Sequence, residues 1–378
     1  MKRKISALVA AVVLSASVLG GCSEGPGESV DSTSTPYSTQ AEVWSTYNTR
    51  KVIRQTDKND EYEKLTASFT VDMYKGEYEG AQIIVTADKR TEYKIEKGVL
   101  KTSDGKEFPS DKIELYHQKY IEVVKNNSGN GDYESGSFIP DMLLPIDRAI
   151  EHKENFVEAG SNQGITAEFN SEGVEAGVYT GTFKLTLGDE TKDIPVSVNV
   201  WDIEYEGRRT FQSSFLLYRK ALVSAEYDSS DEVVRRYEDF LLKYKINTYV
   251  IKDRNEWTTE DVVSRAQELY ADDNYSSIVI PFDFPLDYKA YGGKELTANA
   301  KKVVDYILGL AAVSTETDNY VDLAYFYPST FDEADINGTG SYSEAFLKKD
   351  GEYNKTLAAA AAAIDTDERF TDKSEELK

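Results

Sequence analysis

The hydrophobic residues of this chain change their spacing near residue 206, and this change constrains the fold more than any other feature. From about residue 41 to 205, apolar residues alternate with polar ones, as they do in a β-strand with one buried face. The clearest example is a run at 183–187, a turn at 188–190 and a second run at 194–200. Similar runs occur around 68–74, 82–86 and 113–124, and a turn signal occurs at 103–105. We therefore expect a β-sandwich over residues 41–206.

Past residue 206, short apolar runs alternate with segments whose apolar residues recur at helical spacing. A serine and a glutamate three positions apart, Ser229 and Glu232, predict a capping box where the first of these helices begins. The expected strands are 211–217, 247–252, 276–282 and 321–327, and the expected helices are 229–244, 258–270, 297–313 and 343–364.

Four strand–helix units in alternation imply parallel strands with right-handed crossovers. For residues 207–378 we predict an incomplete (β/α)₈ TIM-like barrel of about four units, because a whole barrel takes about 250 residues. A flavodoxin-like open sheet fits the same alternation. The predicted fold class is therefore multidomain β plus α/β.

The N-terminus has the three parts of a secretory signal over residues 1–21: a positive start, an apolar run and two small residues before Cys22. Leu19-Gly20-Gly21-Cys22 resembles a lipobox, so we expect lipidation of Cys22 and anchoring at the outer face of the bacterial cell membrane. The alternative is an ordinary signal peptide with an incidental cysteine. The polar stretch that follows, to about residue 40, has too little apolar content to fold and is expected to be a disordered tether.

The amino-acid composition limits the kinds of active site and partner that this chain can have. Cys22 is the only cysteine, and His117 and His152 are the only histidines, so a thiolate or multi-histidine metal site has little material. A formal charge of −24 disfavours nucleic acid as a partner. We expect no cofactor and no metal, and chemistry that uses carboxylates, tyrosines and amides.

Catalytic groups of barrels cluster at the carboxyl ends of the strands. This rule selects Asp253 and Asp283 as sugar contacts, together with Tyr327 at the end of the fourth strand. It also selects Asp332 and Glu333, which follow that strand and have the residue types of an acid pair in glycoside cleavage. The alternative for Asp332 and Glu333 is a solvated cluster of charges in a loop.

Four motifs in order resemble glycoside hydrolase family 123, also called domain of unknown function 4091. They are GEYEGAQIIV at 76–85, IPDMLLP at 139–145, AGVYTG at 176–181 and VWD at 200–202. The resemblance implies a β-N-acetylgalactosaminidase-like enzyme that retains configuration. In such enzymes the acetamido oxygen of the substrate is the nucleophile. By motif, Asp332 orients that acetamido group and Glu333 is the general acid and base.

The implied partner is a glycan with a terminal N-acetylhexosamine. The competing hypothesis is a non-catalytic, glycan-binding or structural surface lipoprotein, and a third is the solute-binding lipoprotein of a transporter. An incomplete barrel predicts that this chain alone is inactive or nearly so, and that a homodimer covers the exposed sheet.

Overall fold

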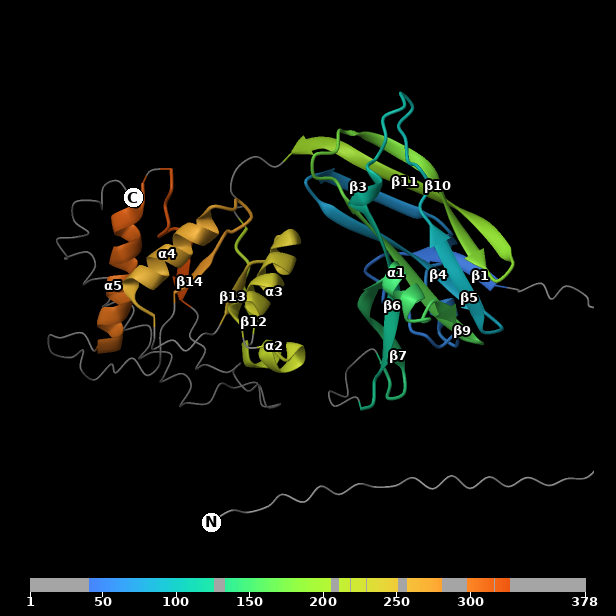
Figure 1. Cartoon of the computed structure of the whole chain (residues 1–378), viewed down its shortest axis with the longest axis horizontal. Coiled ribbons are helices and arrows are strands. Elements are labelled where there is room, and N and C mark those ends of the chain that lie inside the picture. The colour runs from blue at the N-terminus through green and yellow to red at the C-terminus, as the bar shows by residue number, and fades with distance from the viewer. Residues whose placement is uncertain are drawn as a thin grey trace, which may run out of the picture.

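A computed structural model describes residues 41–125, 133–204, 211–217, 219–228, 230–250, 257–280, 298–315 and 317–326. The described chain is mostly β-sheet with some helices (Figure 1). We call residues 41–204 the sheet region and residues 211–326 the strand–helix region. The strands of the sheet region are β1 Ala41–Thr46, β2 Leu65–Thr66, β3 Phe69–Lys75, β4 Tyr78–Ala87, β5 Thr91–Glu96, β6 Ile113–Glu122, β7 Phe138–Pro145, β8 Phe156–Val157, β9 Ser161–Asn170, β10 Gly177–Leu187 and β11 Glu190–Glu204.

The helices of the sheet region are short. They are α1 Ile146–Glu151 and the 3₁₀ turns η1 Asn59–Glu61 and η2 Ser110–Lys112. The elements of the strand–helix region are β12 Phe215–Leu217, α2 Arg219–Glu226, α3 Asp231–Lys243, β13 Thr248–Val250, α4 Thr259–Tyr270, β14 Ile278–Ile280, α5 Ala298–Val313 and β15 Ala324–Phe326.

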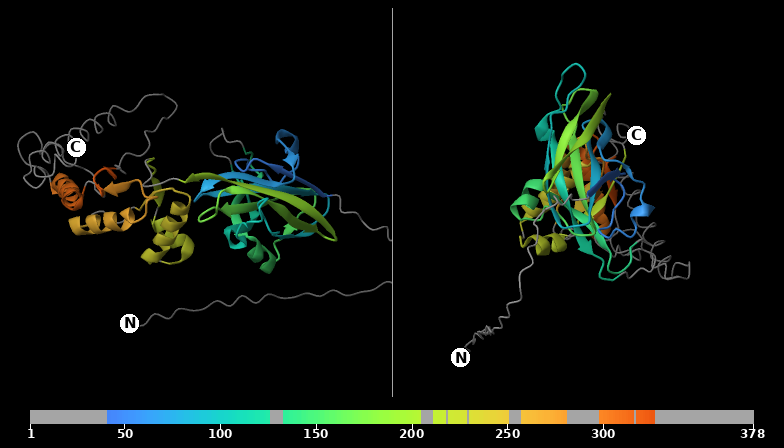
Figure 2. Two further views of the ribbon diagram at one scale, coloured as in Figure 1. Left: turned by 90° about the horizontal axis from the view of Figure 1, so that it is seen from above. Right: turned by 90° about the vertical axis from the view of Figure 1, so that its right-hand side faces the viewer.

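Two sheets share one hydrophobic core in the sheet region. One has the strand order β2-β1-β4-β9-β6-β7 and the other the order β3-β11-β10-β5-β8. Neighbouring strands are antiparallel except β3 and β11, which are parallel. Apolar residues of both sheets, such as Ile83 and Ile165 from one and Phe183 and Val198 from the other, belong to the same buried cluster. The core therefore lies between the two sheets (Figures 1 and 2).

The hairpin predicted from residues 183–200 is confirmed. Strands β10 and β11 pair antiparallel from Gly177↔Val200 to Leu187↔Glu190. The alternating apolar residues of both strands are buried in the core, from Phe183 to Val200. A period of two places all of these side chains on the same face, so pairing and burial reinforce each other.

Strand β9 was not predicted, although Ile165, Ala167 and Phe169 alternate with polar residues, and the strand is buried on both faces. The outer face is covered by the segment that contains η1, where Asn162 Nδ2 donates to Ile53 O at 3.0 Å and to Asn59 Oδ1 at 2.6 Å. A β-carbon at Gly164 would lie 1.9 Å from Gln118 Oε1, so a larger residue there would have to displace the Gln118 side chain.

The strand–helix region departs from the expected alternation at one point. Both α2 and α3 lie between β12 and β13, and α2 was not predicted. The predicted capping box of α3 is wrong: its N-cap is Ser230, whose side chain makes no capping bond, and Ser229 lies outside the described residues. All four expected strands begin later than predicted, at residues 215, 248, 278 and 324. Before β12, β13 and β14, polar residues make side-chain hydrogen bonds instead of ladder bonds.

The described strands of this region form two parallel pairs, β12 with β13 and β14 with β15. A TIM-like barrel, whole or incomplete, and the boundary at 206/207 stay predictions. The expected helix at 343–364 lies outside the described residues.

The two regions meet where the end of α3 contacts the outer face of β9. The Glu168 carboxylate accepts hydrogen bonds from Lys243 Nζ at 2.8 Å and from the Tyr244 hydroxyl. Lys243 Nζ also lies 4.2 Å from the centre of the Tyr78 ring. None of the helices described is sufficiently long and apolar to span a bilayer.

Candidate functional site

The carboxyl ends of the four parallel strands are the candidate site. Strands β14 and β15 run in register from Ile278↔Ala324 to Ile280↔Phe326, and β12 and β13 end on the pair Leu217↔Val250. Because paired strands are parallel, the chain leaves both members of a pair at the same edge. Ile280 and Leu217 are buried, so these strand ends are anchored in packed side chains.

The residues predicted to form the site follow these strand ends directly. Asp253 comes three positions after β13, and Asp283 comes three positions after β14. Tyr327 follows the last residue of β15, and Asp332 and Glu333 come five and six positions later. All five lie outside the described residues, as does Cys22, so the roles assigned to them stay predictions.

The opposite edge, at the amino ends of these strands, is occupied by a buried polar network around Asn247. The Asn247 side chain donates to Asn274 O at 2.9 Å and accepts from Ser276 N at 2.6 Å and from Ser277 Oγ at 3.3 Å. The backbone N–H of Asn247 donates to Ser213 Oγ at 2.9 Å. These bonds satisfy the backbone where β12, β13 and β14 begin. This network has a structural role at the amino ends of the strands.

The most buried acidic side chain between helices is also structural. Glu238 of α3 is buried and accepts a hydrogen bond from Arg265 of α4 at 2.7 Å. Burial raises the pKa of Glu238, and the neighbouring guanidinium opposes that rise. A buried carboxylate held by an arginine between two helices fixes their packing and has no open position for a substrate.

A cleft of about 650 Å³ lies at the junction of the two regions. Each of the three lysines that line it has a partner: Lys75 Nζ contacts Asp202 at 2.6 Å, Lys243 contacts Glu168, and Lys245 donates to Gly76 O at 2.9 Å. Among the described residues, no group of three or more His, Cys, Asp or Glu side chains could hold a metal ion. The cleft is therefore a polar junction between the two regions, and its lysines already have hydrogen-bond or ion-pair partners.

An exposed aromatic pair lies on the outer face of the five-stranded sheet. Trp201 of β11 and Tyr74 of β3 are each 47% exposed, and their ring centroids are 6.3 Å apart at an interplanar angle of 79°. The Trp201 indole N–H donates to Asp72 Oδ1 at 3.2 Å, and Asn199 Nδ2 donates to the same oxygen at 2.7 Å. Two fixed rings beside polar side chains form a surface that suits a sugar ring. The alternation signal gave no reason to expect two aromatic side chains on a face turned to solvent.

Comparison with known proteins gives weak likenesses. The sequence matches no family model and no curated protein. Among solved structures, a family 123 glycoside hydrolase from Clostridium perfringens is similar over 55% of this chain at 12% identity, with a TM-score of 0.43. This chain covers 36% of that enzyme.

Two other similar structures are single domains. The PapD-like domain of human CEP192 has a TM-score of 0.21 at 12% identity, over 48% of this chain and 99% of that one. The CooA pilin subunit of enterotoxigenic Escherichia coli has a TM-score of 0.23 at 14% identity, over 41% of this chain and 99% of that one. Likenesses at these scores identify neither a family nor an activity.

Proposed function

We propose that this protein is a surface-anchored glycoside hydrolase that acts on glycans ending in N-acetylhexosamine. The observation that carries the proposal is the parallel register of β14 and β15, which end on the pair Ile280↔Phe326. The segment with Asp283 and the segment with Asp332 and Glu333 therefore leave the same edge of one strand pair. In parallel α/β folds, this edge is where substrates bind.

The roles of the acidic pair are those that the resemblance to family 123 implies. Glu333, as a carboxylic acid, would protonate the oxygen of the leaving group and later remove a proton from water. Asp332 would orient the acetamido group of the substrate, so that its oxygen attacks the anomeric carbon and the configuration is retained. The four motifs that resemble family 123 lie on β4, β7, β10 and β11, which supports the same assignment.

Two substitutions test this mechanism in the protein expressed from the whole coding sequence. We expect Glu333→Gln to lower kcat by about 10²–10⁴ on N-acetylgalactosaminides with poor leaving groups, because leaving-group protonation is lost. The loss should be much smaller with a 4-nitrophenyl leaving group. Asp332→Asn should slow both kinds of substrate, because acetamido attack precedes departure of either leaving group.

Asp335→Asn is the matched control, because Asp335 belongs to the same cluster of charges and has no assigned role. Its rates should stay close to those of the wild type. If all three variants behave alike, the residues form a solvated charge cluster and the catalytic assignment is wrong.

The anchoring proposal rests on the lipobox-like sequence before Cys22. A radiolabelled fatty acid fed to expressing cells should label the wild-type protein and not Cys22→Ser. Equal labelling of the two would rule out lipidation of this cysteine.

A second candidate function, glycan binding without catalysis, is favoured by the exposed pair Trp201 and Tyr74. Trp201→Ala should abolish retardation of the protein by polysaccharides in affinity electrophoresis. Tyr227→Ala, which removes an exposed aromatic residue from the strand–helix region, should have no effect. Binding by the wild type without turnover would favour this second function.

A further inference from the structure

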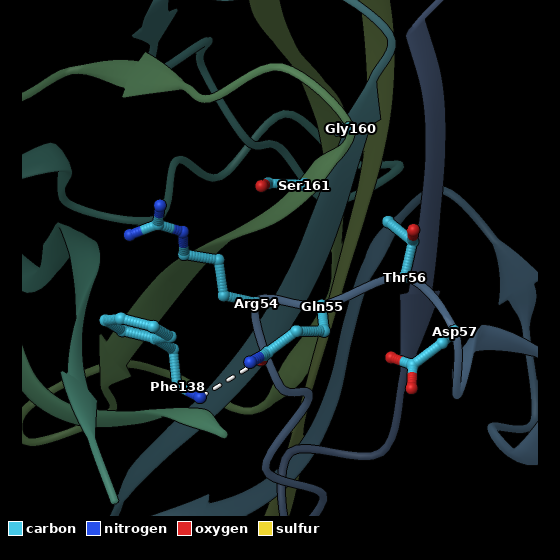
Figure 3. A pocket seen from close by; sticks show the side chains of 7 residues that line it. All are labelled: Arg54, Gln55, Thr56, Asp57, Phe138, Gly160 and Ser161. Atoms are coloured by element: carbon cyan, nitrogen blue, oxygen red, sulfur yellow. Dashed lines mark hydrogen bonds between the residues drawn. The ribbon is translucent and has the colours of Figure 1, made fainter. Parts of the chain in front are cut away.

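A cavity of about 410 Å³ opens in the sheet region, away from the strand ends that carry the proposed catalytic site (Figure 3). Its walls come from the segment 54–57, from the first residue of β7 and from the start of β9. Sites for small ligands typically have volumes of about 300–1,000 Å³, so this cavity is large enough for a monosaccharide. Arg54, Phe138 and Ser161 lie on one side of the view, and Thr56 and Asp57 lie on the other (Figure 3).

The wall that carries Arg54 is held rigidly by its backbone. Arg54 N donates to Phe138 O at 2.9 Å, and Asn162 N donates to Arg54 O at 2.8 Å. The neighbouring Gln55 side chain donates to Gly136 O at 2.7 Å and accepts from Phe138 N at 3.0 Å. The segment is thus fixed between β7 and β9, so a ligand would find the site already formed.

The Arg54 side chain is held in place, yet its charge is not neutralised. Its guanidinium carbon lies 4.8 Å from the centre of the Phe138 ring. Among the described residues, no ion pair and no side-chain hydrogen bond involves the Arg54 guanidinium, although Arg54 lines the cavity.

Arg90 provides the contrast within the same region. Its guanidinium also stacks on an aromatic ring, 3.8 Å from the centre of Phe156. Unlike Arg54, it makes an ion pair, with Nε 3.2 Å from Glu158 Oε1. Arg90 therefore has an internal acceptor, whereas the donors of Arg54 face a cavity.

We propose that this cavity binds a sugar acid, with the ligand carboxylate paired to the Arg54 guanidinium. The planar fork of an arginine matches a carboxylate and forms two parallel hydrogen bonds with it. The hydroxyls of Ser161 and Thr56 line the space beyond, where they can bond to sugar hydroxyls. Asp57 on the opposite side repels a second negative charge, so the site favours a single carboxylate on an otherwise neutral ring. This inference is independent of the proposed hydrolase activity.

Isothermal titration of the full chain with D-glucuronate tests the proposal, with D-glucose and inorganic phosphate as comparison ligands. We expect glucuronate to bind and glucose and phosphate to bind at least tenfold more weakly. Arg54→Gln should weaken glucuronate binding tenfold or more, and Arg54→Lys should restore only part of it, since lysine lacks the two-pronged geometry. Asp57→Asn should tighten binding, because it removes a repelling charge.

Arg90→Gln is the matched control and should leave glucuronate binding unchanged. Circular dichroism of each variant should match that of the wild type, so that a loss of binding is not a loss of folding. The proposal is overturned if the wild type does not bind glucuronate at millimolar concentration, or if Arg54→Gln binds it as the wild type does. Equal binding of glucose or phosphate would overturn it as well.

Discussion

His117 is a buried histidine within the six-stranded sheet. Its Nδ1 lies 2.7 Å from the Tyr93 hydroxyl, and the two rings stack with centroids 6.1 Å apart. Burial lowers the pKa of His117 from 6.5 to about 4, and burial raises the pKa of Tyr93 above its ordinary value. Tyr93 therefore keeps its proton and His117 stays neutral, so the hydrogen bond joins two uncharged groups.

This histidine makes stability depend on pH. Between pH 6.5 and about 4, the unfolded chain binds a proton at His117 that the folded chain does not bind, so stability falls as the pH falls. The contribution over this window is about 3 kcal/mol at most. In urea unfolding at pH 7 and pH 4.5, His117→Gln should lose less stability on acidification than the wild type. The exposed His152→Gln should behave like the wild type, and a wild-type response from His117→Gln would contradict the assignment.

At the scale of the elements, the starts of α3 and α4 differ in how their first turns are satisfied. At α4, the Thr258 side chain accepts from Asp261 N at 3.1 Å, and Thr258 N donates to Asp261 Oδ2 at 2.8 Å. At α3, the Ser230 side chain makes no bond to the first turn. The two helices therefore offer a matched pair of capping positions.

We expect Thr258→Ala to lower the free energy of unfolding by about 1 kcal/mol, because the backbone N–H of Asp261 loses its side-chain acceptor. Ser230→Ala should change the free energy of unfolding by only a few tenths of the change expected for Thr258→Ala. Denaturant unfolding followed by circular dichroism measures both, with stability given by the midpoint at constant slope. Equal losses in the two variants would mean that the reciprocal bonds at Thr258 contribute nothing.

At the scale of the whole molecule, Glu168 couples the two regions. Its carboxylate, on the strand β9, contacts two residues at the end of α3, and its side chain is only 11% exposed. Removing a nearly buried carboxylate leaves Lys243 without its ion-pair partner at the contact. The contact between β9 and α3 therefore depends on this side chain.

Calorimetry can measure the coupling. We expect Glu168→Ala to separate thermal unfolding into two transitions, one for each region, or to widen an existing separation. Glu172→Ala removes the exposed contact to Lys112 at 3.8 Å and should leave the transitions unchanged. A single unaltered transition in Glu168→Ala would mean that the regions are coupled by other contacts.

Elements whose side chains follow one simple period could be predicted from the sequence. The β10–β11 hairpin was predicted because one of its faces is buried and the other solvated, and the helices α4 and α5 were predicted nearly to the residue for a similar reason. The parallel pairing of β12 with β13 and of β14 with β15 followed from their separation by helices. The spacing of apolar residues indicates such elements because each element packs one face against a single neighbouring layer and exposes the other to solvent.

Features that depend on contacts between distant segments could not be predicted in this way. Strand β9 is buried on both faces because residues far along the chain cover it, and polar residues there are satisfied by partners such as Asn59. No local pattern indicates that the Arg54 guanidinium lies over the Phe138 ring without an ion pair, because the two residues are distant in the sequence. The strand ends expected to carry the acidic pair were brought to one edge by register, whereas Asp332 and Glu333 themselves stay predictions. Contacts between distant residues depend on how the whole chain packs, so the spacing of neighbouring residues does not predict them.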